Sequence, residues 1–277
     1  MKEIKYNPKC IMAMDMTNHE YLLTGSQISC FINLPIAIGC KKLIRLFMST
    51  NTGIFRKILN RFILKFAILV FQLKDKVSLE TLPKFANQPK RIRFQLPRII
   101  SNPEYIVIGD DVKFGPGCML KVSTKYPGSW MRHPEGKHIS QTFNPIVVIG
   151  NNVTATSNLH MTATKNITIE DDVMFASNVF LADCSHGYFT ADVPFKYQGL
   201  QNIAPIKIKS GAWICQNVVI LPGVTIGENS IIGANSVVRT NIPAKCIAVG
   251  NPAKVIKKWD AETKTWKRIK KKVNIKI

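Results

Sequence analysis

Residues 205–258 read PIKIKSGAWICQNVVILPGVTIGENSIIGANSVVRTNIPAKCIAVGNPAKVIKK, and they contain the clearest repeat in the chain. Gly, Ala, Asn and Ser are frequent in it, and these residues tolerate the backbone angles of tight corners. Between them, an aliphatic residue returns at every sixth position, at Ile208, Ile214, Ile220, Ile226, Ile232 and Val238. One inward apolar residue every six predicts short flat strands that enclose a triangular core and stack as the coils of a solenoid.

Upstream segments repeat the same spacing. The six-residue step joins Ile169, Phe175 and Leu181, then Ile149, Ala155 and Met161, and more weakly Ile108, Phe114 and Leu120. About five coils are therefore expected. A β-sandwich with chance spacing is the alternative, but its strands would alternate with a period of two and its turns would not be locked to six.

The motifs W-I-C, P-G-V-T-I-G, I-G-A-N-S-V-V and G-N-P-A-K resemble the C-terminal coils of bacterial hexapeptide-repeat acetyltransferases. The resemblance covers about residues 105–258, and Cys215 stands where the family usually has glycine. Within the family it is strongest to enzymes that O-acetylate galactosides, maltose, Nod factors and polysaccharides such as colanic acid. It implies a left-handed parallel β-helix, which departs from the usual right-handed crossover. It also implies acetyl-CoA as acyl donor and a homotrimer with active sites between subunits.

The expected organisation is a mainly β chain with three parts. Residues 1–95 form a basic, partly helical region, residues 96–258 the β-helix, and residues 259–277 a basic tail with a short helix. Two loops, 121–147 and 187–207, interrupt the β-helix, and loops of that length are usually functional. Residues 54–66 predict an amphipathic helix with a basic face, which would either contact an anionic membrane or pack its apolar face on the β-helix.

His186 is the candidate catalytic residue, since it ends a coil where the second loop begins. The resemblance marks this position as catalytic, and a neutral imidazole can take a proton from an attacking hydroxyl. The alternative is a side chain that caps the end of a coil. Asp183, three residues earlier, would orient the imidazole, contact the acceptor or satisfy a corner amide. A backbone N–H between Trp213 and Cys215 is the expected donor to the oxyanion.

The resemblance also carries binding roles to individual positions. Acceptor contacts fall on Thr156, Asn158 and His160, although Thr156 rather than Asn158 aligns with the family's usual asparagine. Positions facing acetyl-CoA fall on Trp213, Gln216, Ala234 and Arg239, and the basic positions near the CoA phosphates on Lys254 and Lys257. Ammonium groups suit phosphates as compact positive charges. The alternatives are ordinary coil packing, a solvated face and a generic basic tail.

Charge and composition narrow the class of partner. The formal net charge is +21, and the basic residues concentrate before residue 100 and after residue 253. Basic terminal regions of this kind are able to bind nucleic acid, an anionic membrane or acidic small molecules. No nucleic-acid-binding module is recognisable, so no nucleic-acid partner is expected.

The chain is expected in the cytoplasm, with the inner face of the cytoplasmic membrane as a second option. Its seven cysteines form no CxxC pair, no apolar segment follows the N-terminal lysines, and the longest apolar run near the N-terminus is Phe66–Phe71. His133 and His138 raise the alternative of a zinc site like that of β-helical carbonic anhydrases. The remaining ligands of such a site cannot be placed, so no metal is expected.

The predicted activity is acetyl-CoA-dependent O-acetylation of a saccharide in bacterial surface polysaccharide synthesis. The acceptor would be a saccharide or a nucleotide- or lipid-linked sugar. N-acetylation of an amino-sugar nucleotide is the nearest alternative. A metal-dependent hydratase would lose activity to chelators, and a non-catalytic β-helix scaffold would be indifferent to His186→Ala.

Overall fold

The computed structural model describes residues 53–127 and 139–269. His133, His138, Cys10, Cys30 and Cys40 lie outside these ranges, so the zinc alternative on the histidine pair stays untested. The chain divides into two compact units, residues 1–66 and 67–277. Among the described residues, no helix combines the length and apolarity that crossing a bilayer requires.

The described residues form one long helix, two 3-10 turns and many short strands in three large sheets. The helix is α3 (Gly53–Glu80), and the 3-10 turns are η2 (Pro103–Tyr105) and η3 (Phe195–Tyr197). In spatial order the nine-stranded sheet contains β1 (Arg93–Phe94), β4 (Lys113–Phe114), β9 (Thr154–Ala155), β12 (Met174–Phe175), β17 (Trp213–Ile214), β20 (Ile231–Ile232), β22 (Cys246–Val249), β23 (Lys254–Asp260) and β24 (Thr265–Arg268).

The six-stranded sheet contains β2 (Arg98–Ser101), β5 (Cys118–Val122), β10 (His160–Ala163), β13 (Phe180–Ala182), β18 (Val219–Ile220) and β21 (Val237–Val238). The five-stranded sheet contains β3 (Ile106–Ile108), β8 (Ile146–Ile149), β11 (Asn166–Ile169), β16 (Ile206–Ile208) and β19 (Thr225–Ile226). Two small antiparallel pairs complete the set, β6 (Lys125–Tyr126) with β7 (Gln141–Thr142) and β14 (Ser185–His186) with β15 (Leu200–Gln201).

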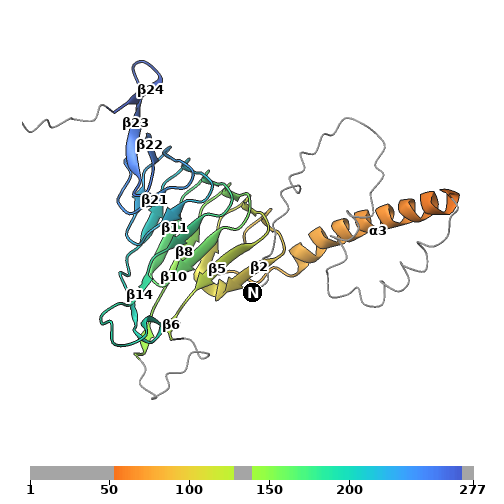
Figure 1. Cartoon of the computed structure of the whole chain (residues 1–277), viewed down its shortest axis with the longest axis horizontal. Coiled ribbons are helices and arrows are strands. Elements are labelled where there is room, and N and C mark those ends of the chain that lie inside the picture. The colour runs from red at the N-terminus through yellow and green to blue at the C-terminus, as the bar shows by residue number, and fades with distance from the viewer. Residues whose placement is uncertain (1–52, 128–138, 270–277) are drawn as a thin grey trace, which may run out of the picture. The chain divides into compact units, whose positions relative to one another are not determined.

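The chain passes through the three large sheets in turn, and each circuit lies in parallel register on the one before (Figure 1). The result is a left-handed parallel β-helix with five complete coils. The repeat predicted the stacked coils, and the family resemblance implied their handedness. A bridge between Ile226 and Ile242 begins to close a sixth coil. The first coil consists of β1, β2 and β3, so the stack begins slightly before the boundary predicted near residue 95.

Every sixth residue points into the core, as predicted. The inward columns are Phe94, Phe114, Ala155, Phe175, Ile214, Ile232 and Ala248 in the nine-stranded sheet, Ile100, Leu120, Met161, Leu181, Ile220 and Val238 in the six-stranded sheet, and Ile108, Ile149, Ile169, Ile208, Ile226 and Ile242 in the third. All but the partly buried Ile100 are buried. A coil alone could not bury these side chains, so adjacent coils stabilise each other.

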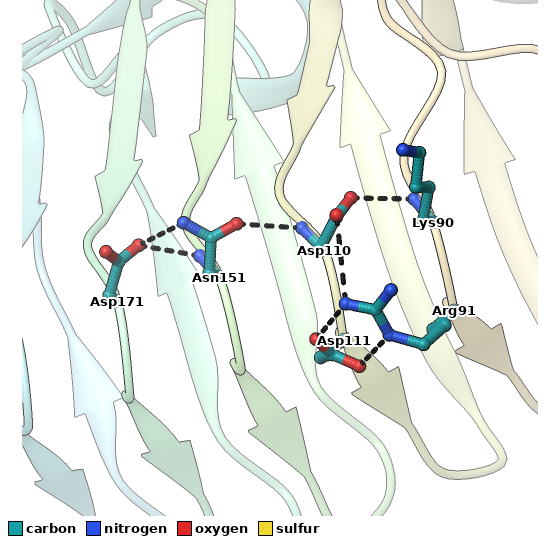
Figure 2. A network of polar contacts seen from close by, with 6 residues as sticks. All are labelled: Lys90, Arg91, Asp110, Asp111, Asn151 and Asp171. Carbon is teal, nitrogen blue, oxygen red and sulfur yellow. Dashed lines mark hydrogen bonds and ion pairs between the residues drawn. The ribbon is translucent and has the colours of Figure 1, made fainter.

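Two of the three edges of the prism are closed by ladders of polar side chains. At the carboxylate edge, defined by Asp110, Asn151 and Asp171, each side chain accepts a backbone N–H from the preceding coil (Figure 2). Arg91 and Asp111 add a bidentate ion pair beside this ladder. The hydrogen bonds satisfy backbone donors where the chain turns a corner.

The asparagine edge is the corner between the nine- and six-stranded sheets. It is defined by a ladder of asparagines with positive φ, in which each side-chain amide donates to the next at 2.9–3.1 Å: Asn158, Asn178, Asn217 and Asn235. Asparagine tolerates this backbone region better than most residues. The recurrence of Asn in the repeat therefore has a structural cause.

The C-terminal segment, as far as residue 269, is a β-hairpin, so the short helix predicted there is wrong for these residues. Strand β23 pairs antiparallel with β22, and β24 continues the same sheet. Trp259 and Trp266 face each other across the hairpin with ring centroids 5.4 Å apart, and Asp260 accepts hydrogen bonds from Thr263 in the turn. The last coil offers an unpaired strand edge, and adding strands to that edge satisfies its backbone groups.

Helix α3 confirms the helical segment predicted in the N-terminal region. Many of its described apolar side chains are exposed, including Phe62 at 70% and Leu69 at 50%. Near its C-terminus, Ser78 is buried and donates to the carbonyl of Phe94 in the first coil, where Arg98 also donates. The end of the helix, which belongs to the second unit, is therefore attached to the first coil.

Candidate active site

The third edge of the prism carries both long insertions, and we call it the insertion edge. Here the chain turns from the six- into the five-stranded sheet. The first insertion, residues 123–145, leaves the second coil, and the second, residues 183–205, leaves the fourth. The coil between them turns tightly at residues 164–165. Strands β6 and β14, one from each insertion, lie close together beside this edge (Figure 1).

The described parts of the two insertions are joined to each other. Gln141 of the first donates from Nε2 to the carbonyl of Leu200 in the second at 3.0 Å, and its Oε1 accepts the Leu200 N–H at 2.6 Å. Tyr126 of the first donates its hydroxyl to the carbonyl of Lys196 in the second at 2.6 Å. The insertions thus form one structure over the tight turn of the third coil.

Asp183 attaches the start of the second insertion to the neighbouring coil. Its carboxylate is fully buried and accepts four hydrogen bonds at 2.7–2.8 Å, from the backbone N–H and hydroxyl of Thr164 and from the N–H groups of Lys165 and Asn166. Both oxygens are committed to the neighbouring coil, and neither contacts the imidazole of His186. Of the three roles predicted for Asp183, these contacts support the corner role, and its assignment as a catalytic residue stays a prediction.

His186 lies at the root of the second insertion in β14, opposite Leu200 of β15. The residue is exposed, and its Nδ1 lies 3.3 Å from the hydroxyl oxygen of Tyr126. The two rings meet edge to face, with centroids 5.7 Å apart. Among the described residues, no side chain or backbone group forms a hydrogen bond with Nε2. That nitrogen is therefore available to a substrate.

Burial sets the ionisation of two neighbours of the histidine. It raises the pKa of the Tyr126 hydroxyl above its ordinary value, so this side chain stays a neutral phenol near pH 7. It also raises the pKa of the Cys184 thiol, and the charge of Asp183 adds to the rise. Since the thiolate is the nucleophilic form, both effects disfavour the nucleophilic form of Cys184.

Two of the backbone N–H groups in the range predicted for the oxyanion donor, Trp213 to Cys215, are already paired. The Trp213 N–H donates to the carbonyl of Ser230 and the Cys215 N–H to that of Ile232, both in the next coil. Strand pairing in the stacked β-helix uses these two groups, and the oxyanion donor stays a prediction.

The predicted acceptor residues lie beside the asparagine edge, away from the insertion edge. Thr156 is exposed at the corner after β9, and Asn158 is the first member of the asparagine ladder. His160 begins β10 and lines a shallow pocket of about 340 Å³ together with Asn158, Asn178, Val179 and Phe180. The structure thus brings Asn158 and His160 together, but separates them from His186 by the width of the six-stranded sheet.

The residues predicted to bind acetyl-CoA lie in different parts of the β-helix. Trp213 is 41% exposed on the outer face of the nine-stranded sheet, and Gln216 and Ala234 lie at the asparagine edge on adjacent coils. At the C-terminal end of the stack, Arg239 and Lys254 line one open pocket of about 370 Å³.

Lys257 lies on the same side of its sheet as Lys254, but outside that pocket. The two residues pair with Ile247 and Val249, which are two residues apart in β22 and so share a face. The bulge in β23 makes this possible, because residues three apart in a regular strand would face opposite sides. Lys257 also pairs with Arg268 of β24.

Sequence reasoning missed Tyr126 and Gln141, which join the insertions to each other and to His186. They lie in the irregular segment between two coils, where no repeat constrains the register. Their partners are 59–70 residues away in sequence. The only signal in the sequence was a tyrosine within a long polar loop, and nothing in the sequence identified its partner.

Comparison with known proteins adds independent information. Residues 205–240 match the model of the bacterial transferase hexapeptide family (six repeats). WbbJ of Escherichia coli K12, named for O-acetyl transfer in lipopolysaccharide biosynthesis, is 31% identical over 185 residues, which cover 64% of this chain and 87% of WbbJ. YJL218W of Saccharomyces cerevisiae, named as an acetyltransferase, is 40% identical over 112 residues, which cover 40% of this chain and 56% of that protein.

Among solved structures, a variant of AntD, an N-acyltransferase from Bacillus cereus solved with dTDP and coenzyme A, superposes with a TM-score of 0.51. The match covers 69% of this chain and 91% of AntD at 19% identity. At that identity the likeness concerns the fold, and it agrees with the coils described above.

Proposed function

The chain belongs to the hexapeptide-repeat acetyltransferases, and from that premise we propose that it transfers an acetyl group from acetyl-CoA to a hydroxyl of a saccharide, with His186 as general base. The proposal depends above all on one observation, the position of His186. It stands exposed at the root of the second insertion, with Nδ1 against Tyr126 and Nε2 free of described partners. The similarity to WbbJ supports a hydroxyl acceptor and a role in surface polysaccharide synthesis.

In the proposed reaction, Nε2 takes the proton from the acceptor hydroxyl as its oxygen attacks the thioester carbonyl carbon. The C–S bond then breaks, and the imidazolium returns the proton to the departing sulfur of CoA. The products are the acetyl ester and free CoA, so atoms and charge balance without a covalent enzyme intermediate. General-base catalysis of this kind contributes about a hundred- to ten-thousand-fold to a rate.

Acceptor-dependent release of CoA tests the function. The purified full chain would be incubated with acetyl-CoA and a panel of oligosaccharides, nucleotide sugars, amino-sugar nucleotides and lipid-linked sugars, and free thiol would be measured. Release that requires a hydroxyl acceptor, with an acetyl ester in the product, supports the proposal. An amide product from an amino sugar would transfer the assignment to N-acetylation, and loss of activity to a chelator would favour a metal-dependent enzyme. Absence of thiol release with every acceptor and acyl donor would argue against a catalytic function.

For the acyl donor, we propose that the pocket lined by Arg239 and Lys254 receives phosphate groups of CoA. Two cationic side chains share this pocket, and charge-assisted hydrogen bonds to phosphate are strong ones. We expect Lys254→Gln to raise the KM for acetyl-CoA about fivefold with little change in kcat, a modest effect because the side chain is exposed. Steady-state kinetics would measure it.

Lys258→Gln is the matched control, because Lys258 is on the same strand but does not line the pocket. Its KM should stay close to that of the wild type. If Lys254 contacts the 3′-phosphate, acetyl-dephospho-CoA should show no difference between the wild type and Lys254→Gln. Equal KM values for acetyl-CoA in all three proteins would contradict the assignment.

A homotrimer with intersubunit sites stays a prediction, and the distribution of residues supports it. His186 and Arg239 flank the insertion edge, whereas Asn158, Gln216 and Ala234 lie at the asparagine edge. If both groups serve one reaction, the second must come from a neighbouring subunit. Sedimentation equilibrium would give the mass, and a fully active monomer would contradict this arrangement.

Peripheral contact with the inner face of the cytoplasmic membrane also stays a proposal. Phe62, Phe66, Leu69 and Leu73 are spaced for one face of α3 and are exposed, and Arg61 and Lys65 add positive charge. Co-sedimentation with vesicles containing anionic lipid tests the contact. Equal recovery with neutral and anionic vesicles would contradict an electrostatic contribution.

A further inference from the structure

We propose that Tyr126 is a positioning residue that selects the tautomer of His186, so that Nδ1 carries the proton and Nε2 presents its lone pair to the acceptor. The inference rests on the proposed role of His186 as general base. Tyr126 lies in the first insertion and His186 in the second, so the selection depends on the contact between the two.

The direction of the hydrogen bonds follows from counting protons. A tyrosine hydroxyl has one proton to donate. At 2.6 Å from the Lys196 carbonyl, which can only accept, the Tyr126 hydroxyl donates that proton to the carbonyl. Toward Nδ1 of His186, 3.3 Å away, the same oxygen must therefore accept. Nδ1 consequently bears hydrogen, and in a neutral imidazole Nε2 is then unprotonated.

The surrounding contacts hold the Tyr126 hydroxyl in place between Lys196 and His186. Tyr126 is only 9% exposed, and its pKa is raised by burial, so the hydroxyl keeps the proton on which the selection depends. Strand β6, which carries Tyr126, pairs with β7, and Gln141 of β7 is joined to Leu200 opposite His186. Phenol, imidazole and the Lys196 carbonyl are therefore held within one assembly of the two insertions.

The selection matters because free histidine prefers the opposite tautomer, with hydrogen on Nε2. In that form the nitrogen available to substrate would be a donor, and it could not accept the proton of the hydroxyl. Without the Tyr126 hydroxyl, a productive encounter would require the minor tautomer. The expected cost is about tenfold in kcat, the scale of one neutral hydrogen bond.

The test uses the full-length chain with ¹⁵N-labelled histidine, in the wild type and in Tyr126→Phe. Long-range ¹H–¹⁵N correlation spectra at about pH 8, where imidazole is neutral, report which ring nitrogen bears hydrogen. The His186 signals are assigned by their loss in His186→Ala. We expect the Nδ1–H tautomer in the wild type and a shift toward Nε2–H in Tyr126→Phe. The variant should also show about tenfold lower kcat with unchanged KM for acetyl-CoA.

Tyr188→Phe is the matched control, since Tyr188 lies two residues from His186 but its hydroxyl accepts from Asn202. It should leave both the tautomer and kcat unchanged. An Nε2–H tautomer in the wild type, or an unshifted tautomer in Tyr126→Phe, would overturn the inference. The wild-type spectrum needs no turnover, and its assignment needs only a folded His186→Ala protein. It therefore decides this point even if the enzyme has another function or Tyr126→Phe does not fold. Full activity in His186→Ala would instead refute the general base.

Discussion

His186→Ala is expected to lower kcat for acetyl transfer by about a hundred- to ten-thousand-fold, the contribution of a positioned general base. The side chain is exposed and its described contacts are to Tyr126, so its removal should leave the coils folded. Binding of acetyl-CoA should also persist, because the base acts on the acceptor hydroxyl. Single-turnover kinetics with the acceptor found by the panel would measure the loss, and calorimetry would measure CoA binding.

His160→Ala is the informative comparison. His160 is the other histidine that the structure describes, and it lies beside the asparagine edge. If it contacts the acceptor, its replacement should raise the acceptor's KM and spare kcat. A His186→Ala protein that is folded, binds CoA and turns over at the wild-type rate would remove His186 from the reaction.

Asp183→Asn is expected to lower the free energy of unfolding by about 3 kcal/mol. The carboxylate accepts four hydrogen bonds, and an amide of the same shape must turn its NH₂ group toward some of those donors. Buried donors left without partners cost about 1–3 kcal/mol each. Urea unfolding at a fixed protomer concentration would measure the change, because assembly into oligomers shifts apparent stability.

Asp192→Asn is the control for this substitution. Asp192 is an exposed carboxylate in the same insertion that accepts from Thr190, so its replacement should change stability by less than about 0.5 kcal/mol. The two roles considered for Asp183 separate clearly. A structural role predicts a lower unfolding midpoint, whereas an Asp183→Asn protein of unchanged midpoint that has lost kcat would support the catalytic assignment.

The six-residue repeat was enough to predict a β-helix and its coils. Every core residue from Ile108 to Val238 that the six-residue step predicted is buried. Such a pattern is readable because one coil repeats the geometry of the next, so each inward position is specified locally and many times. The repeat placed His186 where a coil ends and the second insertion begins, and the family resemblance marked that position as catalytic.

Contacts outside the repeat could be read only from the folded chain. Tyr126 meets His186 across 60 residues of sequence and Lys196 across 70, and no periodic signal relates the two insertions. Asp183 carries the same carboxylate in a catalytic or a structural role, and its burial against Thr164 and its neighbours supports the structural one. At the C-terminus, the edge of β22 selected a hairpin over a helix. Local pattern fixes a coil, whereas a site depends on contacts between segments that only the folded chain brings together.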